Sequence, residues 1–356
     1  MDDVARARWT RNRPGSDHPV DTACTAPWVS LEFDPAGIVY ACCANLLYPL
    51  GRIGEHRLVD IWDGPRARVL KTALLDWDLT VGCASCRWHL EHGRDAPEMA
   101  IYDPLPFEDA APTGPVTMTF SLSNRCNLAC VMCTPELSST IRHRAGLPRL
   151  ESPYDDRFFT DLEPFLPGLR HAKFLGGEPF LAPEHVRVWD LLGSTGATPR
   201  LHVTTNGTVW NDRVERLVNE FVVDLAISVD GATAPTYEAV RDGGRFDDVV
   251  TNIDRFLRAS ATSGAHVHLN FCLMPQTAHE LFAMLAWGDE LGIPVHAIVV
   301  SDPGFALYDL PTADLEDLAR RWTSQDRDGG LDLNAMEWTT QLLSLIHISE
   351  PTRRYA

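Results

Sequence analysis

Three cysteines stand within eight residues of this 356-residue chain, in the segment Cys126-Asn-Leu-Ala-Cys130-Val-Met-Cys133. Three thiolates fill three corners of a cubane iron–sulfur cluster, so one iron would stay open for a small molecule. A zinc site usually closes with four ligands in pairs, and no His or Cys nearby completes such a set. The spacing therefore favours a cluster with an open iron. A three-cysteine zinc site and a redox-sensing cluster are the alternatives.

A second segment, Gly176-Gly177-Glu178-Pro179, follows a short apolar stretch at residues 171–175. Paired glycines let a backbone approach a ligand closely, because they carry no Cβ. A carboxylate beside them can accept hydrogen bonds from an ammonium group. Alone, the segment would be interpreted as an ordinary tight turn. Because the three-cysteine segment precedes it in the chain, we instead interpret Gly176–Pro179 as a segment that contacts a ligand.

The two segments together resemble the radical SAM enzymes. The resemblance implies that a 4Fe–4S cluster is held by Cys126, Cys130 and Cys133. Its open iron would chelate the amino and carboxylate groups of S-adenosylmethionine. One electron would then cleave the sulfonium and give a 5′-deoxyadenosyl radical that abstracts hydrogen from a substrate. The methionine amino group would be contacted by Gly176, Gly177, Glu178 and Pro179.

The resemblance also implies weaker cofactor contacts. Met132 occupies the position that packs near adenine in the family, and four further residues match positions that contact the ribose and the carboxylate: Thr205, Asn206, Ser228 and Asp230. Each of these four can instead cap a helix or satisfy a loop. Cys272 shares a strand face with His268 and Asn270. It is a candidate hydrogen donor to a substrate radical, as in some radical epimerases, with a buried core cysteine as the alternative.

Four more cysteines precede this region. A predicted hairpin carries Cys24 and Cys42 at its two ends, and Cys83-Ala-Ser-Cys86 follows. Four thiolates saturate either a 4Fe–4S cluster or a zinc ion, and chemistry alone leaves the two nearly even. Cys43 is surplus to this set, and we expect it to be a small buried apolar residue, with an exchange of ligands between Cys42 and Cys43 as the alternative.

The spacing of this segment resembles the SPASM/twitch domains, which bind auxiliary 4Fe–4S clusters. The resemblance lies in Cys24-Thr-Ala-Pro-Trp28, in Asp60-Ile-Trp62 and in the Cys83-x₂-Cys86 pair. It implies a second, auxiliary 4Fe–4S cluster on Cys24, Cys42, Cys83 and Cys86. Here the domain precedes the catalytic region, whereas it usually follows it. One ligand set implies one auxiliary cluster.

The elements that must position these residues alternate between strands and helices. Apolar and small polar residues alternate over residues 116–122, and later strands are predicted at 171–175, 201–204, 224–227, 266–273 and 295–300. In the first strand the small polar set should face the cofactor. Thr134-Pro135-Glu136 is a predicted helix start after the cysteine loop. Six β/α units fit an α/β fold with the partial (β/α)₆, TIM-like barrel of the family, preceded by a small cysteine-rich α+β domain.

The predicted organisation has six parts. They are a disordered lead-in (1–20), the twitch/SPASM-like domain (21–100), a Pro-rich linker (101–115), the barrel (116–310), a truncated helical segment (311–342) and a non-native tail derived from a sequencing adapter (343–356). The tail prediction rests on the segment from Leu343 to Arg353, which resembles a translated adapter.

Composition limits the partners. A formal net charge of -18 and a pI of about 5.1 argue against nucleic acid or an anionic membrane. The chain has no apolar run long enough to span a membrane and no signal core, so we expect a cytoplasmic protein. The resemblance implies a small flavodoxin-like or ferredoxin-like electron donor. The substrate would be a peptide, or a small molecule such as a sugar that is dehydrogenated or epimerised.

One rival belongs to another class. A non-catalytic iron–sulfur carrier or redox sensor would keep the fold and the cysteines. It would have no need for a methionine site, so the segment from Gly176 to Pro179 speaks against it.

Overall fold

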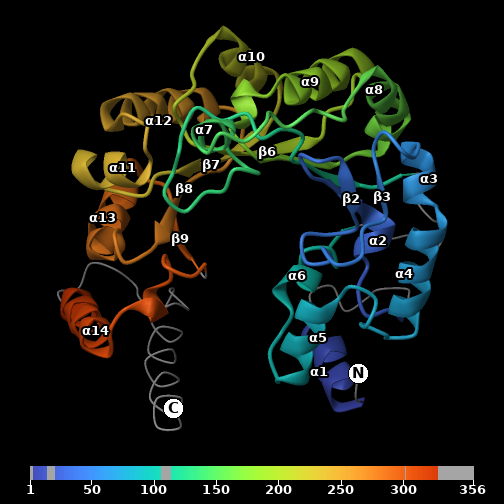
Figure 1. Cartoon of the computed structure of the whole chain (residues 1–356), viewed down its shortest axis with the longest axis horizontal. Coiled ribbons are helices and arrows are strands. Elements are labelled where there is room, and N and C mark those ends of the chain that lie inside the picture. The colour runs from blue at the N-terminus through green and yellow to red at the C-terminus, as the bar shows by residue number, and fades with distance from the viewer. Residues whose placement is uncertain (1–2, 14–20, 106–113, 301, 328–356) are drawn as a thin grey trace. The chain divides into compact units, whose positions relative to one another are not determined.

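The computed structural model describes residues 3–13, 21–105, 114–300 and 302–327 (Figure 1). The chain divides into two compact units. The first contains Met1–Asn127, Thr134–Thr204 and Asp212–Asp224. The second contains Leu128–Cys133, Thr205–Asn211 and Leu225–Ala356. The cysteine loop therefore belongs to both units, with Cys126 in the first and the other two cysteines in the second.

The first unit begins with a helix where the sequence predicted a disordered lead-in. Helix α1 (Asp3–Asn12) buries Trp9, whose Nε1–H donates to the carbonyl oxygen of Ala23 at 3.1 Å. A buried aromatic anchor of this kind offsets the entropy of ordering a polar segment. The prediction of disorder is thus wrong for residues 3–12, and residues 14–20 lie outside the described residues.

The predicted hairpin is confirmed. Strands β1 (Ser30–Phe33) and β2 (Ile38–Tyr40) pair antiparallel, and β2 pairs with β3 (Gly51–Arg52). Asp34 closes the turn, because its Oδ1 accepts the backbone N–H of Ile38 at 2.8 Å. The same unit holds short helices around the hairpin: α2 (Ala26–Val29), α3 (Leu58–Trp62), α4 (Pro65–Leu75), α5 (Ala84–Glu91) and α6 (Pro97–Ala100).

The hairpin continues the sheet of the first β/α units. β1 pairs in parallel with β4 (Thr117–Phe120), in the register Ser30 to Thr117. The strand order in this unit is β3-β2-β1-β4-β5-β6, with β5 (His171–Phe174) and β6 (Arg200–Thr205) also parallel. Three stacked rings join these strands: Phe33 and Phe120 lie 5.5 Å apart, and Phe120 and Phe174 lie 5.2 Å apart. The small N-terminal domain is therefore built onto the same sheet.

Helices follow the strands of the first unit. Buried apolar faces hold them: α9, for example, buries Val188, Trp189 and Leu192. The helices are α7 (Ser139–Arg144), α8 (Asp156–Leu162), the 3₁₀ turns η1 (Glu163–Gly168) and η2 (Pro179–Leu181), α9 (Pro183–Thr195) and α10 (Asp212–Glu220).

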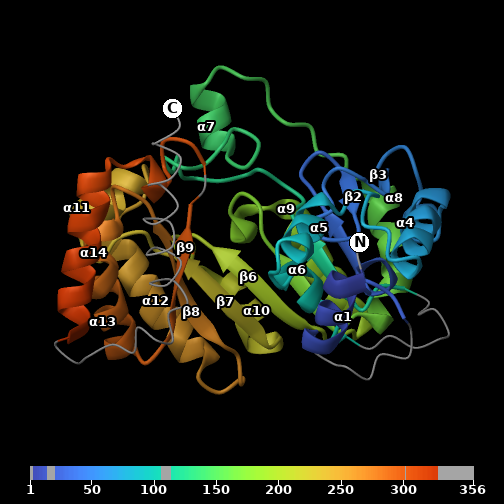
Figure 2. The ribbon, with the colours of Figure 1, turned by 90° about the horizontal axis from the view of Figure 1, so that it is seen from below.

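The second unit repeats the β/α pattern (Figure 2). Strands β7 (Val223–Ser228), β8 (Val267–Leu273) and β9 (Val295–Val299) lie in that order and are parallel. The predicted apolar stripe of α12 (Phe246–Ser260) is buried at Val249, Ile253 and Phe256. The other elements are α11 (Ala234–Val240), η3 (Ala278–Glu280), α13 (Leu281–Leu291), η4 (Leu307–Asp309) and α14 (Thr312–Arg327).

The predicted α/β class is confirmed, since six strands, β4 to β9, are each followed by helix. Of the predicted linker, residues 106–113 lie outside the described residues, whereas Tyr102 and Asp103 are buried. The predicted C-terminal segment begins with α14, and the predicted non-native tail lies outside the described residues. None of the helices within the described ranges combines the length and the apolar composition needed to cross a membrane.

Candidate functional site

The first motif cysteine, Cys126, is held by the start of α7. Its backbone N–H donates to Ser139 Oγ at 3.1 Å, and its carbonyl oxygen accepts from Thr140 Oγ1 at 2.7 Å. Ser138 caps the helix, because its Oγ accepts the N–H of Ile141. The predicted helix start at Thr134 is therefore wrong by four residues. The carbonyl oxygen of Thr134 instead accepts the N–H groups of Leu137 and Ser138 in a turn.

The segment Gly176–Pro179 follows β5 and lies against the chain just before Cys126. Gly176 and Gly177 have φ angles of 81° and 49°, which favour glycine. A Cβ on Gly177 would stand 2.4 Å from the carbonyl oxygen of Arg125, and one on Gly176 would stand 2.0 Å from Ser121 Oγ. The N–H of Glu178 donates to that same Arg125 carbonyl at 2.7 Å. Both glycines are thus required by a close backbone approach.

Glu178 itself is completely buried. Its Oε1 accepts the N–H of Phe180 at 3.1 Å, which caps the 3₁₀ turn η2. His185 lies nearby on α9, and its Nε2 accepts the N–H of Leu122 at 3.3 Å. Burial lowers the pKa of His185 to about 4, so the imidazole is neutral. The loop that carries Glu178 is therefore buried and held by backbone hydrogen bonds.

In the second unit, the backbone around Cys130 pairs with the end of α11. Ala129 N–H donates to the Asp242 carbonyl oxygen at 2.8 Å, and Val131 N–H donates to the Val240 carbonyl oxygen at 2.9 Å. Cys133 N–H donates to the Cys130 carbonyl oxygen at 3.0 Å. These bonds fix Cys130 and Cys133 on one short turn.

A buried charge network lies beside Cys130. Arg241 pairs with Asp230 at 2.7 Å, and the two side chains are 9% and 0% exposed. Arg241 Nη1 also lies 3.8 Å from the Cys130 sulfur. Burial raises the pKa of Cys130, while the charge of Arg241 opposes that rise. Burial lowers the pKa of Arg241, but the charges of Asp230 and Cys130 outweigh it and raise the value overall. A positive charge therefore faces this candidate ligand.

Cys272 lies on the half-buried face of β8 with His268 and Asn270, as predicted. Its backbone N–H donates to Asp230 Oδ1 at 2.7 Å. Its side chain and that of Met132 pack against a buried cluster of Val240, Met274 and Val300. Burial raises the pKa of Cys272 to about 12.

The remaining predicted cofactor contacts make local bonds. Thr205 Oγ1 accepts the N–H of Gly207 at 3.1 Å, and Asn206 Oδ1 accepts the N–H of Thr208 at 3.0 Å. Asn252 holds the same turn, since its Nδ2 donates to the Gly207 carbonyl oxygen at 2.9 Å. Ser228 ends β7 and is half-buried. Thr205 and Asn206 thus both stabilise a loop, which is the alternative role that the sequence left open for them.

The four N-terminal cysteines line one small pocket in the first unit. Its lining consists of Cys24, Cys42, Ala44, Asn45, Leu79, Cys83, Cys86, Glu98 and Met99. Three of the thiols are at least 90% buried, and Asn45 Nδ2 donates to the fourth, Cys83, at 3.3 Å. Within the described residues, no three His, Cys, Asp or Glu side chains stand close enough to hold a single metal ion.

The donor set of this pocket fits a metal–sulfur group. Burial raises the pKa of Cys24 and Cys42 well above the ordinary thiol value. It also raises that of Cys83 to about 11 and that of Cys86 to about 12, with the neighbouring charges adding to the rise. Four crowded thiols can become thiolates together only if a cationic group offsets their charge.

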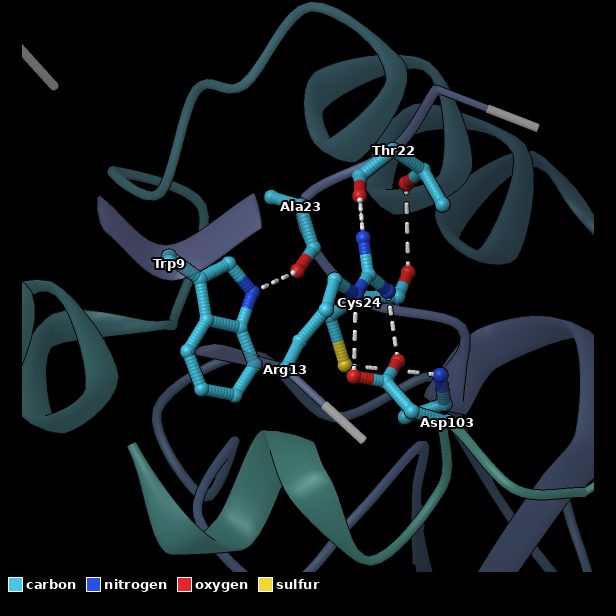
Figure 3. A network of polar contacts seen from close by, with 7 residues as sticks. Trp9, Arg13, Thr22, Ala23, Cys24 and Asp103 are labelled. Atoms are coloured by element: carbon cyan, nitrogen blue, oxygen red, sulfur yellow. Dashed lines mark hydrogen bonds and ion pairs between the residues drawn. The ribbon is translucent and has the colours of Figure 1, made fainter. Parts of the chain in front are cut away.

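A buried ion pair that the sequence analysis missed stands next to this pocket (Figure 3). Arg13, at the end of α1, pairs with Asp103 at 2.5 Å and donates to the carbonyl oxygen of Thr22 at 2.7 Å. Thr22 Oγ1 in turn donates to the Cys24 carbonyl oxygen at 3.2 Å. Because Arg13 and Asp103 are 90 positions apart, no sequence spacing signals their pairing.

Cys43 points elsewhere and is exposed, so the prediction of a buried residue is wrong. It lines a different cavity, of about 510 Å³, inside the first unit. The predicted polar face of β4 lines the same cavity, with Thr117, Thr119 and Ser121. Glu32 stands there too and accepts a hydrogen bond from Tyr102 at 3.0 Å. The chain turns toward this cavity at Cys43 while its neighbour Cys42 faces the four-cysteine pocket.

Two family models match the chain. Residues 120–287 match the Radical SAM superfamily, and residues 24–87 match SPASM, an iron–sulfur cluster-binding domain. The first range contains Cys126, Cys130 and Cys133, and the second begins at Cys24 and ends just after Cys86. The N-terminal match resolves the choice between zinc and a cluster in favour of an iron–sulfur domain.

The similar proteins are distant. GTP 3′,8-cyclase of Listeria welshimeri serovar 6b is 29% identical over 38% of this chain and 39% of its own length. Mycofactocin maturase MftC of Mycobacterium ulcerans is 33% identical over 41% of this chain and 37% of its own length. The chain thus spans about two fifths of the length of these curated relatives. Streptococcus suis SuiB bound to S-adenosylmethionine has a TM-score of 0.43 at 14% identity, covering 79% of this chain and 63% of its own.

Proposed function

We propose that this chain cleaves S-adenosylmethionine reductively. The premise is the match of residues 120–287 to the Radical SAM superfamily, preceded by the match of residues 24–87 to the iron–sulfur cluster-binding SPASM domain. Cys126, Cys130 and Cys133 would hold a 4Fe–4S cluster, which would supply the electron for this cleavage, and the proposed outcome is the abstraction of hydrogen from a substrate by a 5′-deoxyadenosyl radical. Binding, orientation and the exclusion of water fall to the side chains and backbone of the protein.

The observation that carries this proposal is the hydrogen bond from Glu178 N–H to the Arg125 carbonyl oxygen, at 2.7 Å. Arg125 immediately precedes Cys126, so the glycine segment is fixed beside the first candidate ligand. An electron carrier needs no such close approach of two glycines and a buried carboxylate. We propose that Gly176, Gly177, Glu178 and Pro179 receive the methionine amino group at this position.

The other two proposed ligands, Cys130 and Cys133, lie in the second unit. We propose that Arg241 stabilises the thiolate of Cys130, because its Nη1 lies 3.8 Å from that sulfur. Asp230 keeps Arg241 in place through their buried ion pair. In this view Asp230 is a positioning residue. Met132, Thr205, Asn206 and Ser228 stay proposed contacts to S-adenosylmethionine.

The N-terminal pocket is proposed to hold an auxiliary 4Fe–4S cluster on Cys24, Cys42, Cys83 and Cys86. With four thiolates, no corner of that cluster stays open for a substrate. Its proposed role is therefore electron transfer or the shaping of the adjacent structure. The buried pair of Arg13 and Asp103 ties α1 to this pocket, and so makes the N-terminal helix a part of the domain.

The cavity of about 510 Å³ is the proposed substrate chamber. Its volume lies in the range of sites for small ligands, or for one or two peptide side chains. Thr117, Thr119 and Ser121 offer hydroxyls there, and Leu105 and Ile101 offer apolar surface. The proposed substrate is thus a peptide or a small molecule with mixed polar and apolar groups. For Cys272, packing against Met274 and Val300 supports a core role over hydrogen donation.

Electron paramagnetic resonance tests the proposed cofactor site. The protein reconstituted with iron and sulfide should show two reduced clusters, and S-adenosylmethionine should change the spectrum of one. A variant with Cys126, Cys130 and Cys133 replaced by alanine should keep one cluster whose spectrum does not respond. A wild-type protein with two clusters and no response to S-adenosylmethionine would favour the carrier or sensor instead.

A further inference from the structure

A pocket of about 390 Å³ opens on the first unit beside the first motif cysteine. Its lining combines basic, polar and apolar residues: Ser123, Asn124, Arg125, Ser139, Arg142, His143, Leu147, Arg149, Leu150, Pro183 and Glu184. We call the four basic members, Arg125, Arg142, His143 and Arg149, the basic surface. The pocket lining also includes one acid, Glu184.

The charge of the basic surface is opposite to that of the protein. Residues 120–150 include four arginines but only one acid, Glu136, whereas the whole chain carries a formal net charge of -18. A negatively charged partner is therefore repelled by the chain as a whole and attracted at this position. Such a contrast sets the orientation of an approaching protein as well as its rate of association.

The basic surface is built on the same backbone as the first motif cysteine. Arg125 is the residue before Cys126, and Ser139, another lining residue, hydrogen-bonds both the N–H and the carbonyl oxygen of Cys126 at 3.1 Å. A protein bound here would contact Ser139, whose hydroxyl is hydrogen-bonded to the backbone of the proposed cluster ligand Cys126.

The form of the pocket fits a protein rather than a small anion. Among the lining residues, His143 and Arg149 are exposed, and Leu147 is 43% exposed. Arginine around apolar side chains is typical of protein interfaces. Arg142 shapes the pocket wall, since its Nε donates to the carbonyl oxygen of Pro148 at 2.6 Å. A site for phosphate would instead surround the ion with buried donors.

We propose that the basic surface is the docking site of an acidic one-electron carrier protein that reduces the cluster at Cys126. This inference rests on the proposed function, since only a protein that cleaves S-adenosylmethionine reductively needs one electron per cleavage. The reduced carrier loses one electron and the cluster gains it. No bond forms or breaks in that transfer.

The test compares two reductants on the reconstituted full-length protein. Arg149→Glu should lower the rate of 5′-deoxyadenosine formation about tenfold when an acidic flavodoxin and its reductase supply the electrons. The same variant should keep the wild-type rate with dithionite, which needs no docking. Arg216→Glu, an equal charge change at an exposed position of α10, should match the wild type with both reductants.

Direct binding gives a readout independent of turnover. The dissociation constant of the flavodoxin should rise at least fivefold for Arg149→Glu, and for the charge-neutralising pair Arg142→Gln with Arg149→Gln, but not for Arg216→Glu. Unchanged binding and unchanged flavodoxin-driven rates in both variants would overturn the proposal. Saturable binding of inorganic phosphate that Arg149→Glu abolishes, with the flavodoxin rate intact, would overturn it in favour of an anion site. Absence of cleavage with dithionite in the wild type would instead count against the proposed function.

Discussion

Arg241 and Asp230 form an ion pair at 2.7 Å in which both side chains are almost fully buried. The other oxygen of Asp230 accepts the backbone N–H of Cys272 at 2.7 Å. This one carboxylate therefore connects strand β8 to the guanidinium that faces the Cys130 sulfur. Packing of the second unit and the electrostatics of a proposed cluster ligand depend on the same pair.

Asp230→Asn should destabilise the second unit strongly, because it leaves the charge of Arg241 buried without a partner. Breaking a buried pair in this way costs about 3–5 kcal/mol. Urea unfolding of the cluster-free protein measures the change. Asp254→Asn removes one partner of an exposed ion pair with Arg258 and should cost less than about 1 kcal/mol. Equal losses in the two variants would show that the buried pair has no special role.

Gly177→Ala should abolish most S-adenosylmethionine cleavage. Its Cβ would stand 2.4 Å from the Arg125 carbonyl oxygen, so the glycine segment would have to move away from Cys126. Gly146→Ala is the matched control, since Gly146 also has a positive φ, of 67°, but its Cβ would meet nothing within 4 Å. The left-handed backbone should cost both variants about 1 kcal/mol of stability, and the clash should cost Gly177→Ala more. Only Gly177→Ala should lower the cleavage rate, by about 100-fold or more; a wild-type rate would remove the glycine segment from the site.

Replacing Cys42 should lower the iron content of the reconstituted protein, whereas replacing its neighbour Cys43 should not. Cys42 lines the four-cysteine pocket, whereas Cys43 is exposed on another cavity. Cys42→Ala should therefore lower iron and sulfide by about four atoms each per chain after reconstitution. Cys43→Ala should leave both unchanged. Loss of iron in the Cys43 variant would mean that the ligand assignment is off by one residue.

Acid should destabilise the first unit through His185. Burial lowers the pKa of this imidazole to about 4 in the folded chain, below its ordinary value of 6.5. The resulting stability is fully present above pH 6.5 and is lost as pH falls toward 4, with about 2 kcal/mol lost between pH 7.5 and pH 5. His185→Gln keeps an acceptor for the N–H of Leu122 and should reduce this pH dependence by that amount. Urea unfolding of both proteins at pH 7.5 and pH 5 measures this difference in the free energy of unfolding. An identical pH dependence in the variant would show that His185 is not its source.

Local patterns in the sequence predicted most of the architecture. The alternation over Val116–Leu122 and the apolar stripe of α12 are local patterns, because the residues that form each buried face belong to a single element. The apolar residues of β4 and of α12 are buried, as predicted. The two cysteine sets and the glycine segment are short, so their spacing was visible directly. The match to two family models confirms the recognition that rested on them.

Long-range contacts could not be predicted in this way. The helix α1 is mostly polar, and it depends on contacts outside itself, from Trp9 to Ala23 and from Arg13 to Asp103. The start of α7 depends on Ser138 as the cap and on Ser139 bonding Cys126, which overrode the local preference at Thr134. Cys42 and Cys43 differ only in the direction of their side chains, which the fold of the hairpin decides.

The central claim is tested most directly by S-adenosylmethionine cleavage in the anaerobically reconstituted protein with dithionite as reductant. Iron and sulfide are measured on the same sample, beside the variant in which Cys126, Cys130 and Cys133 are alanine. The wild type should form 5′-deoxyadenosine and the variant none, although the variant should still hold its N-terminal cluster. A wild-type protein with both clusters loaded and S-adenosylmethionine intact would contradict it.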